Sequence, residues 1–543
     1  MTRIVVSAVI LASLWGCAQN PLPEASSLSS RLLVEESPGS SFSAFIPPVP
    51  ELDPNCLADP MLVAGYPLPD YDDLWDRLRL GFSLAPQQNA RIDDHRAWYA
   101  RHPEYIDRVT ERAQRYLYAI VDKLEQRNMP LEFALLPIVE SAFDPFNYSH
   151  ARAAGMWQFI PGTARMYGLK INYWYDGRRD IEASTDAALD YLSDLHKRLD
   201  GDWLLALAAY NTGEGNVKKA IRRNERAGKP TDFWSLSLPR ETQAYVPQLL
   251  ALKQIVTEPA AFNISLPVIS NQAYYRAVAV DSQIDLAKAA ELAELDINDL
   301  YFLNPGFNKW ATDPKGPHRL LFPLDNADIF EQNLENYPIE NRVTWENYRV
   351  KQGDSLLLIA KHFNTEVDVI KDVNNLRSNT IGINQQLLIP IATKNSDHYA
   401  YSEVERRQRT QENSRGAKGT QKITHVVQEG DSFWKIAQLY KVSVSRLTKW
   451  NGMAPKDPLK PGQKLVVWAE SDRITTVVQH KRAGDPLIRK VNYQVRNGDS
   501  LSRIASKFNL KINDIISWNS IKNQKYIHPG QRLTLFVDVT RVN

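Results

Sequence analysis

Apolar and polar positions alternate in two different ways along this chain of 543 residues. From about residue 72 to residue 260, apolar side chains recur every three or four positions, Ala and Leu are frequent, and β-branched runs are few. This spacing is typical of amphipathic helices that bury one face. It predicts a mainly α-helical domain over residues 66–260.

A second pattern occurs three times toward the C-terminus. It is seen in YRVKQGDSLLLIAKHF (348–363), THVVQEGDSFWKIAQLY (424–440) and YQVRNGDSLSRIASKF (493–508). Each copy predicts a strand, a Gly-Asp-Ser turn, two short helices and a closing strand, with Asp or Ser placed to cap the first helix. Polar stretches at 394–420 and 469–490 separate the copies and are expected to be flexible linkers.

Two local signals add detail to the predicted structure of the repeats. The second helical stretch of each copy ends near an asparagine, at Asn374, Asn451 or Asn519. Gly462 and Gly530 precede the closing strand in the second and third copies, and the first copy has Asn384 there. Glycine and asparagine both tolerate a left-handed backbone, so we predict a positive φ at this position.

The N-terminus contains an apolar run of about twelve residues, followed by Gly16 and Cys17. The run is shorter than the roughly 20 residues that span a bilayer and predicts a signal peptide over residues 1–16. The sequence Leu-Trp-Gly-Cys resembles a bacterial lipobox, which implies that Cys17 is lipidated. Ala18 favours the outer membrane, and residues 17–65 are predicted to be a lipidated N-terminus and disordered tether.

Charge is unevenly distributed, although the net charge is only +2. Residues 1–340 carry 32 basic and 45 acidic side chains, whereas residues 341–543 carry 33 and 18. A basic C-terminal part favours attraction to an anionic polymer or surface, and a solvated lysine-rich surface would give the same count. The overall composition is that of a soluble globular protein, and the length predicts several domains.

The helical part contains a carboxylate in an apolar setting. In PIVESAFDPF, Glu140 follows the run LEFALLPIV. Burial disfavours the charged form of a carboxyl group and raises its pKa toward that of a general acid at neutral pH. A paired core carboxylate would show the same pattern. Glycoside cleavage usually needs a second carboxylate, and the sequence offers Asp176 and Asp180. Asp180 precedes Ile-Glu-Ala and is expected to cap a helix, so we assign both a structural role.

Four motifs in the helical part occur in the order and at the spacing that are typical of one known family. They are ESAFDP, AAGMWQFIPGTARMYGL at 153–169, LAAYNTGEGNV at 207–217 and ETQAYVPQLLAL at 241–252. Together they resemble the soluble lytic transglycosylase family, whose catalytic domains are lysozyme-like and helical. The resemblance implies that Glu140 is the catalytic acid/base. It implies that the cleft is lined by Ser141, Gln158, Tyr210, Asn211, Glu241 and Tyr245. Trp157 replaces a smaller residue, and we expect it to alter stacking against a sugar.

The C-terminal repeats resemble LysM domains, which bind chains containing N-acetylglucosamine. The fold class expected for the whole chain is therefore α+β multidomain, with a helical lysozyme-like catalytic domain followed by three βααβ LysM domains. We place the LysM domains at residues 347–391, 423–468 and 492–537. Residues 261–343 form an accessory region that resembles a degenerate LysM unit without the Gly-Asp-Ser turn, and we expect it to pack on the catalytic domain.

These resemblances imply a peptidoglycan lytic transglycosylase. It would cleave the β-1,4 bond between N-acetylmuramic acid and N-acetylglucosamine and leave 1,6-anhydromuramic acid ends, with no metal and no cofactor. The expected partners are peptidoglycan glycan strands and, through Cys17, the outer membrane of a Gram-negative bacterium on its periplasmic side. No nucleic acid partner is expected. Two alternatives remain open, a lysozyme-type hydrolase and a non-catalytic peptidoglycan-binding tether.

Overall fold

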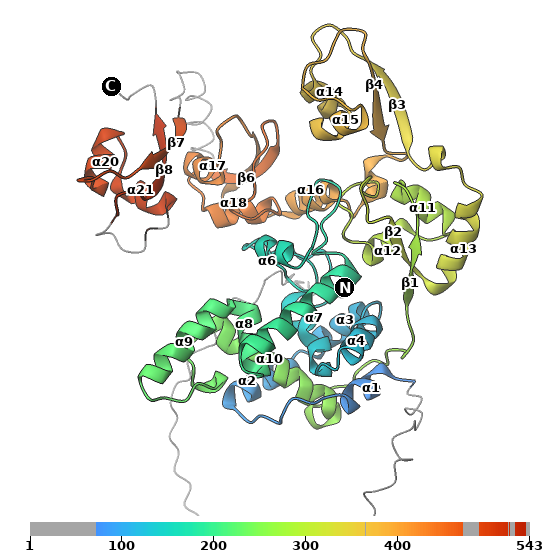
Figure 1. Cartoon of the computed structure of the whole chain (residues 1–543), viewed down its shortest axis with the longest axis vertical. Coiled ribbons are helices and arrows are strands. Elements are labelled where there is room, and N and C mark those ends of the chain that lie inside the picture. The colour runs from blue at the N-terminus through green and yellow to red at the C-terminus, as the bar shows by residue number, and fades with distance from the viewer. Residues whose placement is uncertain (1–71, 364, 471–487, 520, 522–526, 539–543) are drawn as a thin grey trace, which may run out of the picture. The chain divides into compact units, whose positions relative to one another are not determined.

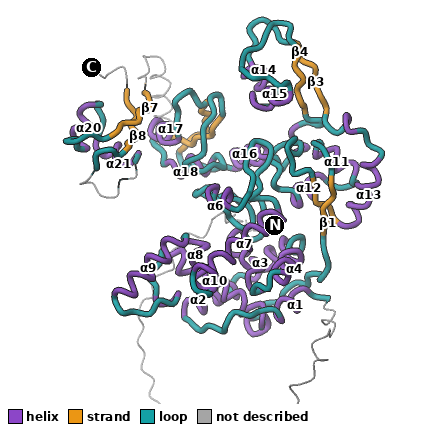
Figure 2. Tube along the Cα trace, in the orientation of Figure 1, coloured by secondary structure: helices purple, strands orange, loops and turns teal. Residues whose placement is uncertain are grey.

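The computed structural model describes residues 72–363, 365–470, 488–519, 521 and 527–538 (Figure 1). The predicted signal peptide, Cys17 and the predicted tether lie outside the described residues. Helices make up the described chain up to residue 262, and short strand pairs with helices between them follow (Figure 2). The predicted α+β multidomain fold class is confirmed. None of the described helices is both long enough and apolar enough to cross a membrane.

The helical part contains ten α-helices and three short 3-10 helices within the described residues. They are α1 (Leu74–Leu80), α2 (Ala90–Ala100), α3 (Pro103–Ala113), α4 (Leu117–Gln126), η3 (Leu131–Leu135), α5 (Leu136–Ser141), α6 (Pro161–Met166), α7 (Ile181–Arg198), α8 (Trp203–Thr212), α9 (Glu214–Arg226), η4 (Phe233–Ser235), α10 (Arg240–Thr257) and η5 (Pro259–Phe262).

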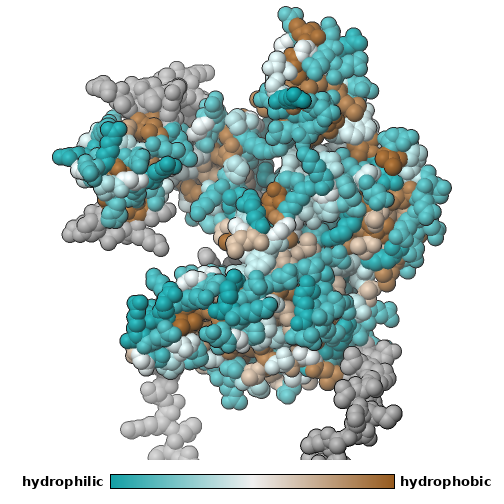
Figure 3. Space-filling view, in the orientation of Figure 1, coloured by the Kyte–Doolittle hydropathy of each residue, from teal (hydrophilic) through white to brown (hydrophobic). Residues whose placement is uncertain are grey.

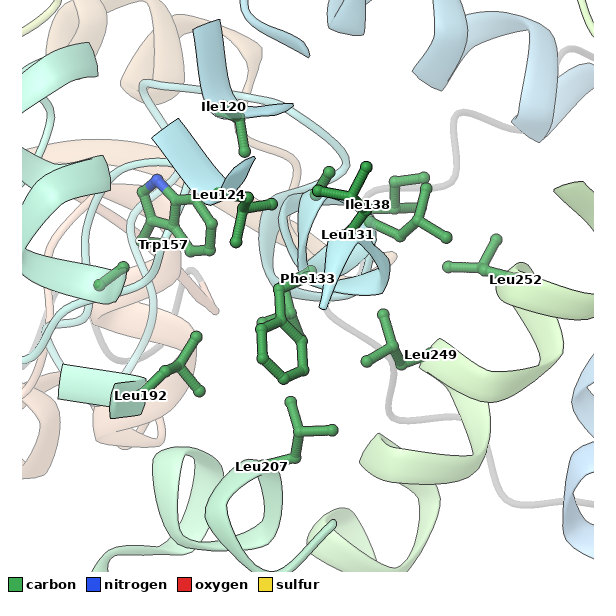
Figure 4. Packing of buried hydrophobic residues seen from close by; sticks show 14 of the residues in the cluster. Ile120, Leu124, Leu131, Phe133, Ile138, Trp157, Leu192, Leu207, Leu249 and Leu252 are labelled. Carbon is green, nitrogen blue, oxygen red and sulfur yellow. The ribbon is translucent and has the colours of Figure 1, made fainter. Parts of the chain in front are cut away.

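One hydrophobic core joins these helices. Figure 4 shows Phe133 of η3 at its centre, with Leu192 of α7, Leu207 of α8 and Leu249 of α10 around it. All four side chains are fully buried. The helix α8 is buried on every side over residues 205–209, which explains why its sequence is apolar throughout and shows no polar face. The segment that carries Glu140 is therefore built into the core.

Residues 275–341 form a smaller unit with two antiparallel strands. Its elements are β1 (Tyr275–Ala279), α11 (Leu286–Leu292), α12 (Ile297–Leu303), β2 (Arg319–Pro323), α13 (Leu324–Glu335) and η6 (Ile339–Asn341). The Asn304 amide nitrogen donates to the carbonyls of Leu300 and Leu321, and its oxygen accepts from the Leu321 amide. This buried asparagine ties the second helix to the closing strand.

This smaller unit packs on the helical part. Tyr175 pairs with Phe307 in an isolated bridge, and the Asp176 amide donates to the Gly306 carbonyl at 2.8 Å. Leu303 and Leu321 belong to the same core as the helices. The two parts therefore share apolar burial where they meet.

Each of the three repeats consists of two antiparallel strands around two helices. The first is β3 (Thr344–Arg349), α14 (Leu356–His362), α15 (Val367–Val373) and β4 (Gln386–Ile391). The second is β5 (Thr420–Val426), α17 (Phe433–Tyr440), α18 (Val444–Trp450) and β6 (Lys464–Glu470). The third is β7 (Ile488–Gln494), α20 (Leu501–Lys507), α21 (Ile512–Trp518) and β8 (Arg532–Asp538).

The local signals of the repeats have physical explanations. Asn374, Asn451 and Asn519 each make the same three hydrogen bonds that Asn304 makes. In the Gly-Asp-Ser turns the serine caps the first helix, and the aspartate instead closes the turn by accepting from a backbone amide. The predicted positive φ is confirmed, at +66° for Asn384, +85° for Gly462 and +88° for Gly530.

The prediction that residues 394–420 are a flexible linker is wrong. They contain η7 (Ser396–Tyr399) and α16 (Glu403–Asn413). The buried Tyr399 hydroxyl donates to Asp285 of the smaller unit at 2.9 Å, and Glu403 lies 3.0 Å from Lys309. At the other end of α16, Gln411 donates to Asn451 at 2.8 Å. Tyr399 and Asp285 are 114 positions apart, so no local pattern indicates this packing. Most of the other predicted linker, at 471–487, lies outside the described residues.

Candidate active site

Glu140 lies in the last turn of α5, and an unusual backbone ends that helix. Ala142 has a φ of 52° and its amide donates to the Ile138 carbonyl, which forms a left-handed helix cap. Phe143 follows with a φ of 55°. Positive φ is unfavourable for residues other than glycine, and such strain is concentrated at functional sites. The chain therefore turns away sharply just after Glu140.

The surroundings of Glu140 favour its protonated form. Burial raises its pKa to about 8, and the negative charge of Glu241 adds to the rise. The side chain keeps part of its surface accessible to solvent, as a group that meets a substrate must. A carboxyl group with this pKa holds its proton at neutral pH and is able to donate it.

Tyr245 of α10 is the direct hydrogen-bond partner of Glu140. Its hydroxyl donates to Glu140 Oε1 at 2.5 Å. A hydrogen bond donated to a carboxylate stabilises the ionised form, so this contact lowers the pKa of Glu140 and opposes the effect of burial. Burial and the nearby Glu140 carboxylate raise the pKa of the Tyr245 hydroxyl, which therefore keeps its own proton. Tyr245 fixes the orientation of the acid.

The loop at 153–159 is bound to α5 and α8 by predicted site residues. The Ser141 hydroxyl lies 3.0 Å from the Met156 carbonyl, and the Tyr210 hydroxyl donates to the Trp157 carbonyl at 2.8 Å. The Gln158 amide folds back on the Gly155 carbonyl at 2.7 Å. Ser141 is only 7% exposed, so its hydroxyl serves to hold this loop beside Glu140.

Gly155 allows the loop to approach its neighbour. Its φ is +81°, and a Cβ at this position would lie 2.0 Å from the Arg178 carbonyl oxygen. Only glycine avoids that clash with backbone. The Gly-x-x-Gln spacing of the motif thus reflects a tight loop that holds Gln158 in place.

The structure also shows a contact that the motifs did not reveal. The hydroxyl of Thr242, on α10, donates to Asn211 Oδ1 at 2.8 Å and is 1% exposed. This bond orients the Asn211 amide at the C-terminal end of α8. Thr242 stands between Glu241 and Tyr245 in the ETQAY motif, but its pairing with a residue 31 positions away has no local signature.

The expectation for Trp157 is wrong. Its side chain is completely buried, and its indole nitrogen donates to Thr185 Oγ1 at 3.0 Å. It packs in the core next to Leu124 and Leu192 (Figure 4). A ring with no exposed face cannot stack against a sugar. The Trp157 ring instead attaches the loop at 153–159 to the hydrophobic core.

Asp176 and Asp180 are engaged in structural contacts. Asp180 caps α7 by accepting from the Ala183 amide at 2.7 Å, which confirms the predicted cap. Asp176 is 3% exposed and lies 2.7 Å from Arg178 and 2.8 Å from Arg179. The two guanidinium groups hold the pKa of Asp176 below its usual value. Within the described residues no group of three or more His, Cys, Asp or Glu side chains is arranged to hold a metal ion.

A protonated glutamate in a helical domain, followed by repeats that share one βααβ plan, defines a class of protein. Residues 118–233 match the Transglycosylase SLT domain, and residues 348–390, 425–468 and 493–536 match the LysM domain. Residues 274–339 match the LysM-like domain of the lytic transglycosylase MltD. The chain is a lytic transglycosylase that carries LysM domains.

Comparison with whole proteins narrows the class. The chain is 37% identical over 420 residues to the membrane-bound lytic murein transglycosylase D of Escherichia coli (strain K12). The matched region covers 74% of this chain and 87% of that protein. It belongs to the family of membrane-bound lytic murein transglycosylase D.

Two further likenesses cover less of the chain. A protein of Alteromonas sp. (strain M-1) named for tributyltin chloride resistance is 37% identical over 202 residues, which are 36% of this chain and 96% of that protein. The X-ray structure of the lytic transglycosylase Slt from Pseudomonas aeruginosa matches 27% of this chain and 25% of that one, at 22% identity and a TM-score of 0.21.

Proposed function

We propose that Glu140 is the sole catalytic carboxyl group and that it cleaves the β-1,4 bond between N-acetylmuramic acid and N-acetylglucosamine in peptidoglycan. The observation that carries the proposal is the largely buried position of the Glu140 carboxyl group, which raises its pKa to about 8, together with its hydrogen bond from Tyr245. Asp176 and Asp180, the other acidic candidates in the sequence, are bound to arginines and a helix end. Gln158, Tyr210, Asn211 and Glu241 are proposed to line the cleft around the sugar.

The proposed reaction uses one protein group twice. Protonated Glu140 donates its proton to the glycosidic oxygen while the bond from that oxygen to the anomeric carbon breaks. The oxygen of the substrate's own 2-acetamido group stabilises the positive charge at the anomeric carbon. The ionised Glu140 then removes the proton of the muramic acid C6 hydroxyl, and the C6 oxygen bonds to the anomeric carbon. Water is not consumed, and Glu140 regains its proton.

The products distinguish this reaction from hydrolysis. Purified protein incubated with intact sacculi should release muropeptides whose new muramic acid ends are all of the 1,6-anhydro form. Such ends are lighter by one water than the ends left by a hydrolase, and they resist borohydride reduction. Mass analysis of the released muropeptides measures both properties. Reducible ends would indicate attack by water and a lysozyme-type hydrolase. The absence of any soluble product would support a non-catalytic tether.

Removing the Tyr245 hydroxyl should shift the pH dependence of cleavage. Glu140 must start protonated, so kcat/KM should fall as the pH rises through about 8, the pKa of the group in the free enzyme. Tyr245→Phe removes a hydrogen bond that stabilises the ionised carboxylate, so the pKa of Glu140 should rise and the alkaline limb should move up by about one pH unit. The measurement is the pH profile of kcat/KM from pH 5 to 10. An alkaline limb that stays in place or moves down would show that Tyr245 does not control this proton.

We propose further that the protein is held in the cell envelope by a lipid on Cys17. The support is the Leu-Trp-Gly-Cys sequence after a short apolar run, together with the word membrane-bound in the name of its relative. Ala18 and the family favour the periplasmic side of the outer membrane. Cys17→Ser should move the protein from the outer-membrane fraction to the soluble periplasmic fraction or leave it unprocessed. Unchanged fractionation of that variant would exclude the anchor.

A further inference from the structure

The helix α9 has one buried face and one strongly basic face. Val217, Ala220 and Asn224 are buried, at the spacing of successive helical turns. The Asn224 amide donates to the carbonyls of Pro230 and Ser235 and thereby holds the following loop against the helix. In the space-filling view most of the surface around α9 is hydrophilic, with a small hydrophobic patch within it (Figure 3).

This arrangement leaves a groove, here called the α9 groove, of about 520 Å³. Its lining consists of Asn216, Lys219, Ala220, Arg222, Arg223, Arg226, Ala227, Ser237, Leu238 and Pro239. Four of these side chains are cationic and exposed, and no carboxylate lines the groove.

The cations of the α9 groove lack partners of opposite charge. Among the described residues, Lys219, Arg222 and Arg226 form no salt bridge, and Arg223 donates only to the Ser237 carbonyl. The neighbouring Glu214 is already paired with Arg198 and Lys218. Four like charges in one concave surface repel one another, and an anion placed among them relieves that repulsion. Guanidinium groups bind carboxylates in pairs of parallel hydrogen bonds.

The α9 groove lies next to the candidate active site along the chain. The Asn216 side chain donates to the carbonyl of Thr212 at 2.7 Å, and Thr212 directly follows Asn211 in the chain. Pro239 lines the groove and directly precedes α10, whose first turn carries Glu241 and Thr242. Glu241 is close enough to Glu140 to raise its pKa. The lining of the α9 groove thus ends two positions before Glu241.

We propose that the α9 groove binds the free carboxylates of the stem peptides that are attached to muramic acid. The proposal rests on peptidoglycan being the substrate of Glu140. A stem of four residues extends about 13 Å from the sugar, which suffices to reach beyond a single helical turn. The groove then selects peptide-bearing glycan, and because the same contacts exist before and during bond cleavage, they act on KM rather than on kcat.

The test compares three soluble substrates and two variants of the full chain. The substrates are a tetrasaccharide with tetrapeptide stems, the same compound with its carboxyl groups amidated, and the peptide-free tetrasaccharide. The groove variant is Lys219→Gln/Arg222→Gln/Arg226→Gln. The matched control is Arg101→Gln/Arg108→Gln/Lys197→Gln, which removes three exposed charges outside the groove, one just after α2, one in α3 and one in α7.

Wild type and the control should show a KM about tenfold lower for the substrate with free carboxylates than for the other two. The groove variant should lose this difference and keep its kcat. A wild-type KM that is equal for all three substrates, or a groove variant that keeps the preference, would overturn the proposal. A groove variant with weakened binding to phosphatidylglycerol vesicles and unchanged KM values would assign the groove to lipid headgroups and overturn it too.

The same reagents separate failure of the groove from failure of the proposed reaction. If wild type forms no anhydro ends, calorimetric binding of the free and amidated tetrasaccharides still measures the preference of the α9 groove. Tighter binding of the free form by wild type, lost in the groove variant, supports the groove whatever the reaction is. Equal binding of both forms by wild type overturns it.

Discussion

Glu140→Gln should lower the rate of glycan cleavage by 10² to 10⁴-fold, because glutamine keeps the shape of the side chain but has no proton to donate. The measurement is kcat on purified sacculi, with anhydro ends counted by mass analysis. A variant that keeps more than a tenth of the wild-type rate would exclude Glu140 as the general acid.

The same substitution should stabilise the protein at high pH. The pKa of Glu140 is raised in the folded state, so between about pH 4.5 and 8 the unfolded chain loses a proton that the folded chain retains. The stability of wild type should therefore fall across this window by at most about 5 kcal/mol, an upper bound because the side chain is partly exposed and solvent screens the effect. Glu140→Gln lacks this loss. The two proteins should have similar unfolding free energies at pH 4 and differ at pH 9.

Glu132 provides the control for this pair of effects. It lies in η3, just before α5, is fully buried, and accepts hydrogen bonds from Leu84 and from Lys253 at 2.7 Å. Glu132→Gln leaves the Lys253 charge without its partner and should destabilise the protein by about 1–3 kcal/mol. Its folded fraction should form anhydro ends at the wild-type rate. Glu140→Gln should thus stabilise the protein at high pH and lower its activity. Glu132→Gln should destabilise the protein and leave its activity unchanged.

Asp176→Asn should destabilise the protein by about 3–5 kcal/mol, because it leaves the guanidinium groups of Arg178 and Arg179 buried without a charge to balance them. The measurement is the denaturant midpoint, with kcat determined per folded molecule. The kcat should stay close to that of wild type. A loss of kcat with unchanged stability would identify Asp176 as a catalytic carboxylate and contradict the single-acid proposal.

Asp186 offers a matched control. It also bridges two cations, Lys123 and Arg127, but its side chain is 39% exposed. An exposed pair of this kind contributes less than about 1 kcal/mol. Asp186→Asn should therefore shift the midpoint far less than Asp176→Asn does.

The sequence reveals those parts of the fold whose signals are local. The Gly-Asp-Ser turns and the asparagines at the ends of the second helices lie within one repeat, so they indicate each repeat independently. Glu140 stands out because its neighbours in the chain are also its neighbours in the core. The cap at Asp180 depends only on the amide of Ala183, three residues on.

Contacts between distant segments are not visible in the sequence. Trp157 is in a motif that is predicted to line a cleft, yet its indole points to Thr185 in the core. The polar residues near Tyr399 suggest a solvated linker, and only the fold brings Asp285 within reach of its hydroxyl. Thr242 is one more polar residue in a helix until the structure places it against Asn211. In each case the partner is decided by tertiary packing.

The helix α16 affects how the LysM domains on either side of it search for glycan. It has 11 residues and is therefore about 16 Å long, with one end held by Lys309 and the other by Asn451. A helical spacer extends less readily than a coil, so it narrows the range of distances at which the second LysM domain engages glycan. One inserted residue would also rotate the following domain by about 100° around the helix axis. The effect of an insertion or deletion in this segment thus depends on how far it rotates the following domain around the helix axis, and not only on the change in length.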